Sequence, residues 1–349
     1  MIGTVAAIER GPGREMAALM VDGQLQDILI DPRPDDSSPQ PGAIYRGILD
    51  RTPKGMHGAL VRLGNGQTGF LKETKGLAPG ATILVQVSTA TEPGKAAPVT
   101  QRLLFKSRYA IITPGAPGVN IARSIREEDA RSQLGDIAKA AMKGADSELG
   151  LILRSACREA DAQDIAADIH EMRQLAESIL SETNANEPEL LLDAPSAGLV
   201  AWRDWSDPDP DEVADHIGAF EAHGVWEAIE ALKDPRVMLA GGAWMSIEAT
   251  RALVAVDVNT GGDFTPAAAL KANIAAARAL PRQLRLRGYG GQIVVDFAPG
   301  PKRDRAVIEQ SLSAALRAEG TESHIAGWTP LGHCEIQRRR DRRPLAELL

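Results

Sequence analysis

Aromatic residues and cysteines are scarce in this sequence. Phe, Trp and Tyr make up 4% of the 349 residues, whereas hydrophobic residues make up 44%, so a core must consist largely of Ala, Leu, Val and Ile. The two cysteines, Cys157 and Cys334, lie far apart and outside any CxxC arrangement. This spacing argues against a disulfide framework and a self-contained zinc site, and we expect both thiols to be buried or idle.

Long apolar runs and targeting signals are missing as well. No apolar stretch approaches the ~18 residues of a membrane span, and residues 1–16 lack the charged start, apolar run and cleavage site of a signal peptide. We therefore expect a cytoplasmic protein without a membrane span. The length is enough for two or three domains of roughly 100 to 200 residues.

Negative charge is concentrated in one segment. The net charge is −8, but residues 157–235 hold 20 Asp and Glu against 4 Lys and Arg, which leaves 27 against 35 elsewhere. A polyanion can approach the remainder of the chain without net repulsion. The most acidic stretch, "WRDWSDPDPDEV" (202–213), is typical of an exposed loop that opens a helix.

Three zones follow one another along the chain. Residues 1 to about 110 contain short runs rich in Val and Ile between turn signals, such as "GALVRLG" and "TILVQVS", which predict an all-β barrel. The middle zone is mixed, with a strand predicted at 149–155 and a helix at 162–180. From residue 245 onward, two apolar runs and the helical segment between them predict a strand, a helix and a second strand.

The two strands of this last zone are "RALVAVDV" (251–258) and "QIVVDF" (292–297), which read as strands buried on both faces. Thr265 and Pro266 open the connecting helix, and Gly288 ends it. Pro281 is expected to interrupt or kink that helix. Another helix is predicted from about residue 302 to residue 317.

An aspartate marks the carboxyl end of each strand. A strand, helix and strand of this length form a βαβ unit, so Asp257 and Asp296 should emerge side by side on parallel neighbours ~4.8 Å apart. Two carboxylates so close need a cation between them, and oxygen ligands favour magnesium or manganese. Asn259 points to the same side, and Gly261 and Gly262 would leave room for a phosphate.

Each of these residues, taken alone, could have a purely structural role. Asp257 could merely end a strand and Asp263 could cap the helix, but the matched aspartate pair with Asn259 favours a metal site. Such a site suits phosphodiester hydrolysis. The basic segments "RQLRLR" and "RRRDRR" could contact a nucleic-acid backbone, although the second could equally be a solubilising tail.

Several motifs occur together in a family-specific order. "PRVMLAGGAWMSIEATRALVAVDVNTG", "ARALPRQLRLRGYGGQIVVDF" and "GHCEIQRRR", between about residues 235 and 343, resemble the catalytic core of the ribonuclease E/G family. Upstream, residues 42–71 are similar to that family's OB-fold domain, and "LGLILRSA" (149–156) resembles its 5′-monophosphate sensor.

The resemblance implies an α/β multidomain fold. The expected parts are an N-terminal β segment packing on the core (1–40), an OB-fold β-barrel RNA-binding domain (41–108), a 5′-sensor and acidic connecting region (109–235), and an α/β, DNase I-like catalytic domain (236–349).

The resemblance also implies roles for individual residues. Asp257 and Asp296 would hold the catalytic Mg²⁺, with Mn²⁺ as the alternative ion, and Asn259 would orient the attacking water or the scissile phosphate. Arg154 and Ser155 would bind the 5′-phosphate. Single-stranded RNA is the expected partner, and its other contacts would be Phe70, Lys95, Arg123, Arg338 and Arg340, although without the resemblance Phe70 is better explained as barrel core.

The sequence departs from the family's pattern in places. The two-cysteine zinc-link motif is missing, so neither zinc nor a zinc-linked dimer is expected, whereas other oligomers stay open. Arg251 and Pro299 stand where relatives carry acidic residues, and Leu60 stands where an aromatic residue is expected.

We therefore predict an endoribonuclease that cleaves single-stranded RNA by Mg-assisted hydrolysis, leaving 5′-phosphate and 3′-hydroxyl ends, in RNA processing or decay. The alternative is a catalytically weak or inactive RNA-binding protein of the same fold. A nuclease that acts on DNA is the third hypothesis.

Overall fold

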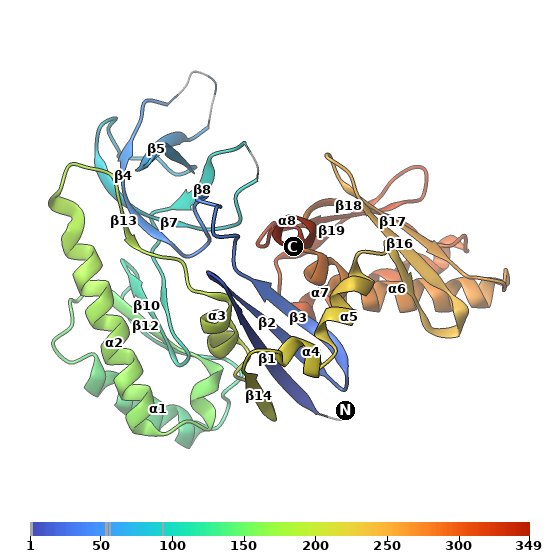
Figure 1. Ribbon diagram of the computed structural model, residues 1–349, viewed down its shortest axis with the longest axis horizontal. Coiled ribbons are helices and arrows are strands. Elements are labelled where there is room, and N and C mark those ends of the chain that lie inside the picture. The colour runs from blue at the N-terminus through green and yellow to red at the C-terminus, as the bar shows by residue number, and fades with distance from the viewer. Residues whose placement is uncertain (1–2, 53–54, 56, 93) are drawn as a thin grey trace. The chain divides into compact units, whose positions relative to one another are not determined.

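The computed structural model describes residues 3–52, 55, 57–92 and 94–349 (Figure 1). The chain divides into two compact units. In the described chain, one unit comprises residues 18–28 and 216–349, and the other comprises residues 3–17 and 29–215. No described helix is both long enough and apolar enough to cross a membrane.

A closed five-stranded barrel lies within residues 29–215. Its strands are hydrogen-bonded in the order β4-β5-β6-β8-β7, and β7 pairs again with β4 to close the barrel. Side chains alternate, so that Val61 and Leu63 enter the core while Arg62 faces out. The strands are β4 (Ile44–Leu49), β5 (Ala59–Gly64), β6 (Gln67–Leu71), β7 (Thr82–Val87) and β8 (Ala97–Thr100), and β13 (Glu189–Leu192) adds to β4.

The N-terminal strands form a separate sheet instead of part of the barrel. Strands β1 (Thr4–Gly11), β2 (Arg14–Val21) and β3 (Gln24–Ile30) join β14 (Glu212–Asp215) in the order β14-β1-β2-β3. The barrel predicted over the first 110 residues is therefore confined to β4 through β8. This OB-like barrel agrees with the resemblance.

The acidic segment 202–213 does not open a helix. It begins within α3 (Ala197–Asp204), crosses a loop and ends in β14, which pairs in parallel with β1. The prediction of a helix opening there is wrong, because β1, a strand far away in the sequence, supplies backbone hydrogen-bond partners to the end of this segment.

A second sheet in the same unit, ordered β11-β12-β10-β9, is covered by two helices. The predicted strand at 149–155 ends at Leu153, and the predicted helix at 162–180 is confirmed. Cys157 is buried in this core, and burial raises its pKa to about 12, as expected of an idle thiol. The elements are β9 (Phe105–Lys106), β10 (Ala110–Pro114), β11 (Gly118–Ile121), β12 (Leu149–Leu153), α1 (Glu128–Ala141) and α2 (Ala162–Ser181).

The other unit holds a six-stranded mixed sheet ordered β15-β16-β17-β18-β20-β19. Strands β17 and β18 are parallel neighbours joined through α6, which confirms the predicted βαβ unit. The strands are β15 (Arg236–Met238), β16 (Trp244–Ala249), β17 (Val254–Asn259), β18 (Gly291–Asp296), β19 (Ser323–Trp328) and β20 (Cys334–Arg338); the helices are α4 (Ala219–Ala222), α5 (Val225–Leu232), α6 (Pro266–Arg287), α7 (Arg305–Glu319) and α8 (Leu345–Leu348).

Helix α6 has the ends that its sequence predicts. The Thr265 hydroxyl accepts a hydrogen bond from the Ala268 amide, and Gly288 ends the helix with a φ of 67°. The interruption expected at Pro281 does not occur: α6 runs unbroken from Pro266 to Arg287. The side chains around Pro281 are buried in the core, and this packing holds the helix together there.

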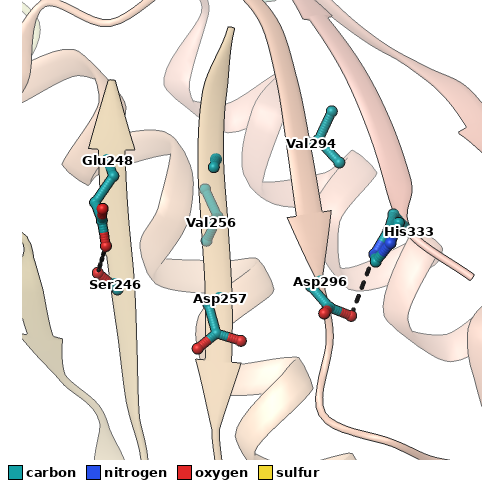
Figure 2. A pocket seen from close by; sticks show the side chains of 8 residues that line it. Ser246, Glu248, Val256, Asp257, Val294, Asp296 and His333 are labelled. Atoms are coloured by element: carbon teal, nitrogen blue, oxygen red, sulfur yellow. Dashed lines mark hydrogen bonds and ion pairs between the residues drawn. The ribbon is translucent and has the colours of Figure 1, made fainter. Parts of the chain in front are cut away.

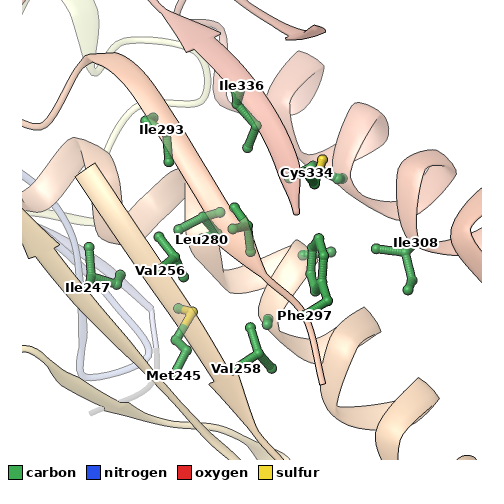
Figure 3. Packing of buried hydrophobic residues seen from close by; sticks show 14 of the residues in the cluster. Met245, Ile247, Val256, Val258, Leu280, Ile293, Phe297, Ile308, Cys334 and Ile336 are labelled. Carbon is green, nitrogen blue, oxygen red and sulfur yellow. The ribbon is translucent and has the colours of Figure 1, made fainter. Parts of the chain in front are cut away.

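One face of the six-stranded sheet is buried against α6 and α7 (Figure 3). The other face of β17 is exposed, since buried and exposed residues alternate along the strand. The expectation that this strand is covered on both faces is therefore wrong, because exposed Ala255 made its apolar run look continuous. The core includes Met245, Ile247, Val256, Val258, Leu280, Ile293, Phe297, Ile308, Cys334 and Ile336.

Candidate functional site

Two carboxylates lie side by side on the open face of the six-stranded sheet (Figure 2). The parallel register of β17 and β18 pairs Asp257 with Asp296, and Asp257 faces Ser246 of β16 on its other side. Both aspartates are exposed, and 59% of the Asp296 side chain is accessible. The adjacency expected from the strand-helix-strand pattern is confirmed.

Each carboxylate has a polar neighbour. The Asn259 side-chain amide donates a 2.7 Å hydrogen bond to Asp257 Oδ2, as its position two residues further on the same face permits. His333 Nδ1 lies 3.3 Å from Asp296 Oδ1. This histidine was not singled out from the sequence, although it lies in the motif "GHCEIQRRR", because only the pairing of β20 with β18 brings it beside the aspartate.

Asp257, Asp296 and His333 line a cavity of about 330 Å³, and its carboxylates suit a hard divalent cation. None of the described residues that line it is Lys or Arg, so His333 is the one basic residue among them. The described chain has no cluster of three or more His, Cys, Asp or Glu side chains arranged to hold a metal ion. A cation at Asp257 and Asp296 would thus keep several waters, as magnesium usually does. The lining residues are Ser246, Glu248, Ala255, Val256, Asp257, Val294, Asp296 and His333.

The glycines after Asn259 differ in their surroundings. Gly261 has a φ of +75°, and a Cβ there would lie 2.5 Å from the carbonyl oxygen of Gly242. A Cβ on Gly262 would meet nothing within 4 Å. Gly261 is therefore required by the close approach of two loops, which is a different reason from the phosphate access that the sequence suggested.

Comparison with known families agrees with this geometry. The model of the ribonuclease E/G family matches residues 105–217 and 206–341. This chain belongs to the ribonuclease E/G family.

Named relatives match nearly the whole chain. Ribonuclease E of Nostoc sp. is 28% identical over 389 residues, which cover 96% of this chain but 56% of the relative. Ribonuclease G of Salmonella typhimurium is 26% identical, covering 88% of this chain and 74% of the relative. Ribonuclease G of Haemophilus influenzae is 26% identical, covering 97% and 80%. The chain thus spans little more than half the length of the ribonuclease E relative.

The arginine to which the resemblance assigns the 5′-phosphate, Arg154, is hydrogen-bonded to a carboxylate in this ribonuclease E/G family member. Arg154 directly follows β12 and donates to the Ser107 carbonyl at 2.7 Å, to the Arg203 carbonyl at 3.0 Å and to Asp204 Oδ1 at 2.7 Å. Burial alone would raise the pKa of Asp204, but hydrogen bonds and charge from Arg203 and Arg154 lower it. Ser155 comes next and begins a 3₁₀ turn. Asp204 therefore accepts a hydrogen bond from the Arg154 guanidinium, the group that the resemblance assigns to binding a phosphate.

The acidic loop makes two further pairs of this kind. Arg158 lies 3.5 Å from Asp207, and buried Arg108 pairs with Asp209. The charge run is thus bound to arginines at these positions and is not simply a solvated face.

Phe70 lies on the outer face of the barrel. It is half-buried, it pairs across the sheet with Leu60 and Pro98, and the core cluster of the described barrel residues does not include it. Lys95 and Arg123 are exposed, and Lys95 Nζ contacts Glu92 Oε2 at 2.6 Å. The structure thus excludes Phe70 from the barrel core, and the RNA contacts of all three residues stay predictions.

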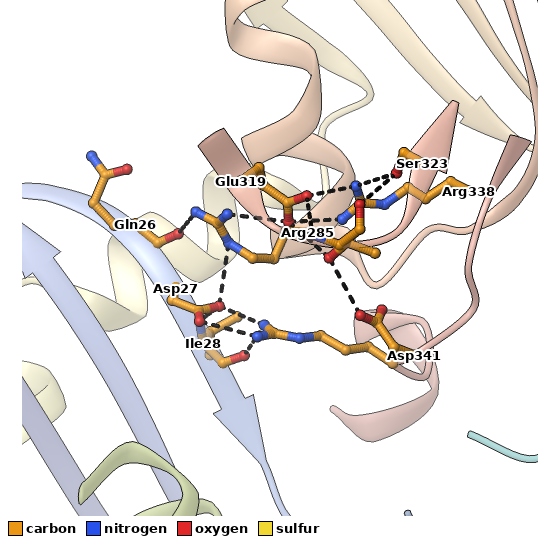
Figure 4. A network of polar contacts seen from close by, with 10 residues as sticks. Gln26, Asp27, Ile28, Arg285, Glu319, Ser323, Arg338 and Asp341 are labelled. Atoms are coloured by element: carbon orange, nitrogen blue, oxygen red, sulfur yellow. Dashed lines mark hydrogen bonds and ion pairs between the residues drawn. The ribbon is translucent and has the colours of Figure 1, made fainter. Parts of the chain in front are cut away.

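Arg338 is buried, which contradicts the RNA contact expected of it. Only 2% of its side chain is exposed, and its guanidinium donates two hydrogen bonds, of 2.7 and 2.8 Å, to the Glu319 carboxylate (Figure 4). Arg285 also lies 3.2 Å from Glu319. Burial would raise the pKa of Glu319, but Arg338 and Arg285 lower it. Arg340 is exposed, and its RNA contact stays a prediction.

The departures from the family's pattern lie in different places. Arg251 is exposed in the turn between β16 and β17, at the opposite end of β17 from the carboxylate pair. Pro299 is exposed three residues after Asp296. Arg251 is therefore separated from the site by the length of a strand, whereas Pro299 is close to it in the chain.

Proposed function

We propose that this protein is an endoribonuclease that cleaves single-stranded RNA with a divalent ion, Mg²⁺ or Mn²⁺, held by Asp257 and Asp296. The observation that carries the proposal is the directly opposed carboxylate pair in a member of the ribonuclease E/G family. The relatives named ribonuclease E and ribonuclease G support an RNA substrate and a role in RNA processing or decay.

The chain's own residues would prepare this chemistry. The bound ion would make water a better nucleophile and neutralise charge on the phosphate. Asn259 restrains the Asp257 carboxylate through its hydrogen bond, and His333 flanks Asp296. If water attacks phosphorus while the bond to the 3′-oxygen breaks and that oxygen takes up a proton, the products carry a 5′-phosphate and a 3′-hydroxyl.

Arg154 and Ser155 would bind a 5′-monophosphate, as the family resemblance implies. A phosphate must then displace Asp204 from the Arg154 guanidinium. We expect Asp204→Asn to increase the preference for 5′-monophosphorylated RNA and Arg154→Ala to abolish that preference. Comparing cleavage rates of RNAs with a 5′-monophosphate and a 5′-hydroxyl measures both effects.

The OB-like barrel would provide a second RNA contact. Phe70 lies next to Leu60 and Pro98 on the barrel's outer face, where a base could stack on the ring. Lys95, Arg123 and Arg340 would contact the backbone with charge.

The deciding experiment is cleavage of a short AU-containing single-stranded RNA with Mg²⁺ and with chelator. Cleavage should require the metal and should be lost in Asp257→Asn and in Asp296→Asn. Glu335→Gln is the matched control, since Glu335 is an exposed carboxylate on β20 that pairs with Val294 instead of another carboxylate. Tight RNA binding without cleavage under every metal would support the alternative, a binding protein of the same fold. Equal cleavage of matched DNA would support a nuclease of broader substrate range.

A further inference from the structure

Four chain connections meet at the sheet edge that carries the two aspartates. Strands β15, β17, β18 and β19 run in the same direction, because each is parallel to the next or separated from it by one antiparallel strand. Their carboxyl ends therefore share one edge. The connections that leave this edge are residues 239–243, 260–265, 297–304 and 329–333.

Close contacts link these connections to one another. Gly261 of the second connection packs so tightly on the Gly242 carbonyl of the first that a Cβ would not fit. His333, at the end of the fourth connection, reaches Asp296 at 3.3 Å. A Cβ on Gly332 would lie 3.2 Å from the guanidinium of Arg305, which follows the third connection. Contacts thus join the second connection to the first, and the fourth connection to Asp296 and to Arg305.

Exposed apolar side chains are concentrated on this edge. Phe264 is 88% exposed, Leu331 is 85% exposed and Met238, at the end of β15, is 62% exposed. They are the three most exposed large hydrophobic residues of the segment 236–349; Phe264 and Leu331 lie on two of the connections, and Met238 is the last residue of β15, directly before a third. Scattered single residues of this kind are ordinary, but three at the same edge of the sheet that carries the two aspartates offer a binding surface for an apolar ligand.

The remaining connection carries positive charge. Lys302 and Arg303 are exposed on the segment between β18 and α7, and the Arg303 side chain is 87% accessible. Apolar surface beside cations matches single-stranded nucleic acid, which offers base faces and a phosphate backbone together. A duplex hides its base faces and matches this combination poorly.

We propose that Met238, Phe264 and Leu331 form an apolar rim that binds RNA bases on either side of the phosphate at Asp257 and Asp296. Lys302 and Arg303 contact the backbone of the same strand. This inference rests on the proposed function and extends it, because it makes the cleavage site itself selective for unpaired RNA, independently of the barrel.

Photo-crosslinking tests the position of the bases. The full chain is incubated in chelator, so that RNA stays intact, with short single-stranded RNAs that carry 4-thiouridine at one position at a time. Crosslinks are expected in peptides containing residues 260–265 and 329–333. Crosslinks confined to other peptides would overturn the proposal.

Affinity measured by fluorescence anisotropy tests the energetic contribution. Phe264→Ala should weaken single-strand binding at least about fivefold, and Phe264→Trp should restore it, because base stacking on an aromatic ring contributes roughly 1–3 kcal/mol. Ile217→Ala is the matched control, since Ile217 is 87% exposed but precedes α4, outside the six-stranded sheet. Equal affinities of Phe264→Ala and Ile217→Ala, or equal binding of duplex and single strand by the wild type, would refute the rim.

Two other outcomes separate the rim from neighbouring hypotheses. If Phe264→Ala changes the sedimentation coefficient and leaves RNA affinity intact, the rim joins two copies of the chain and the RNA proposal is wrong. If RNA crosslinks at the rim but is not cleaved with Mg²⁺ or Mn²⁺, RNA binding by the rim is supported and the proposed nuclease function is refuted.

Discussion

Replacing Asp296 with Asn should stabilise the protein when no divalent metal is present. Asp296 faces Asp257 at a ladder spacing of ~4.8 Å, and the described cavity lining includes no Lys or Arg. Because 59% of the Asp296 side chain is exposed, a water-like dielectric applies, and two charges ~5 Å apart then repel by about 1 kcal/mol. Asp296→Asn should therefore raise the free energy of unfolding in chelator by about that amount.

Urea denaturation followed by circular dichroism measures this difference, at about pH 8 so that imidazoles ordinarily carry no charge. Adding Mg²⁺ at about ten times its dissociation constant should stabilise the wild type by about 1.4 kcal/mol and Asp296→Asn by much less. The control Glu335→Gln removes an exposed carboxylate from the same face and should change neither value by more than about 0.5 kcal/mol. A destabilised Asp296→Asn in chelator, or equal stabilisation of both proteins by Mg²⁺, would refute the repulsion argument.

Three further predictions concern the buried ion pair and the histidine. Arg338→Ala should destabilise the fold by about 3–5 kcal/mol in urea denaturation, because it leaves the Glu319 carboxylate buried without its bidentate partner; a loss below 1 kcal/mol would contradict this reading. The pKa of Glu319 is lowered in the folded protein, so the Glu319 carboxylate stabilises the fold above its ordinary pKa. This stabilisation is lost as the pH falls through the folded-state pKa. Glu319→Gln should therefore flatten the acid limb of a plot of unfolding free energy against pH. His333→Leu should weaken Mn²⁺ binding about tenfold, as measured by the electron paramagnetic resonance signal of free Mn²⁺. His333→Asn keeps a hydrogen-bond donor near Asp296 and should retain most of the Mn²⁺ affinity. Unchanged affinity in both variants would exclude a positioning role for His333.

Local features of the fold could be predicted because they depend on neighbours in the chain. Thr265 begins α6 and Gly288 ends it through hydrogen bonds and a backbone angle that involve only adjacent residues. The pairing of Asp257 with Asp296 was also predictable, since a βαβ crossover of this length leaves few alternatives to parallel neighbours. All three residues expected at the reaction centre thus lie together: topology pairs the two aspartates, and Asn259, two residues after Asp257, is hydrogen-bonded to it.

Other features depend on segments far apart in the sequence. Residues 212–215 form a strand because β1 lies beside them, although their composition favoured a loop before a helix. Arg338 sits in a basic run that suggested RNA binding, but β20 carries it to Glu319, where it is buried. The apolar run of β17 looked doubly buried, yet only one of its faces is covered.

Short-range signals in the sequence were enough to predict the ends of α6, the order of the family motifs and the pair of aspartates at two strand ends. These depend on backbone sterics, capping and short-range topology, which the local residues decide. Contacts between distant segments are different: His333 lies beside Asp296, Asp204 is hydrogen-bonded to Arg154, and Met238, Phe264 and Leu331 are exposed at the sheet edge that carries the two aspartates. Each of these arrangements arises from pairing between distant strands and loops, and that pairing depends on the packing of the whole domain rather than on any short stretch of sequence.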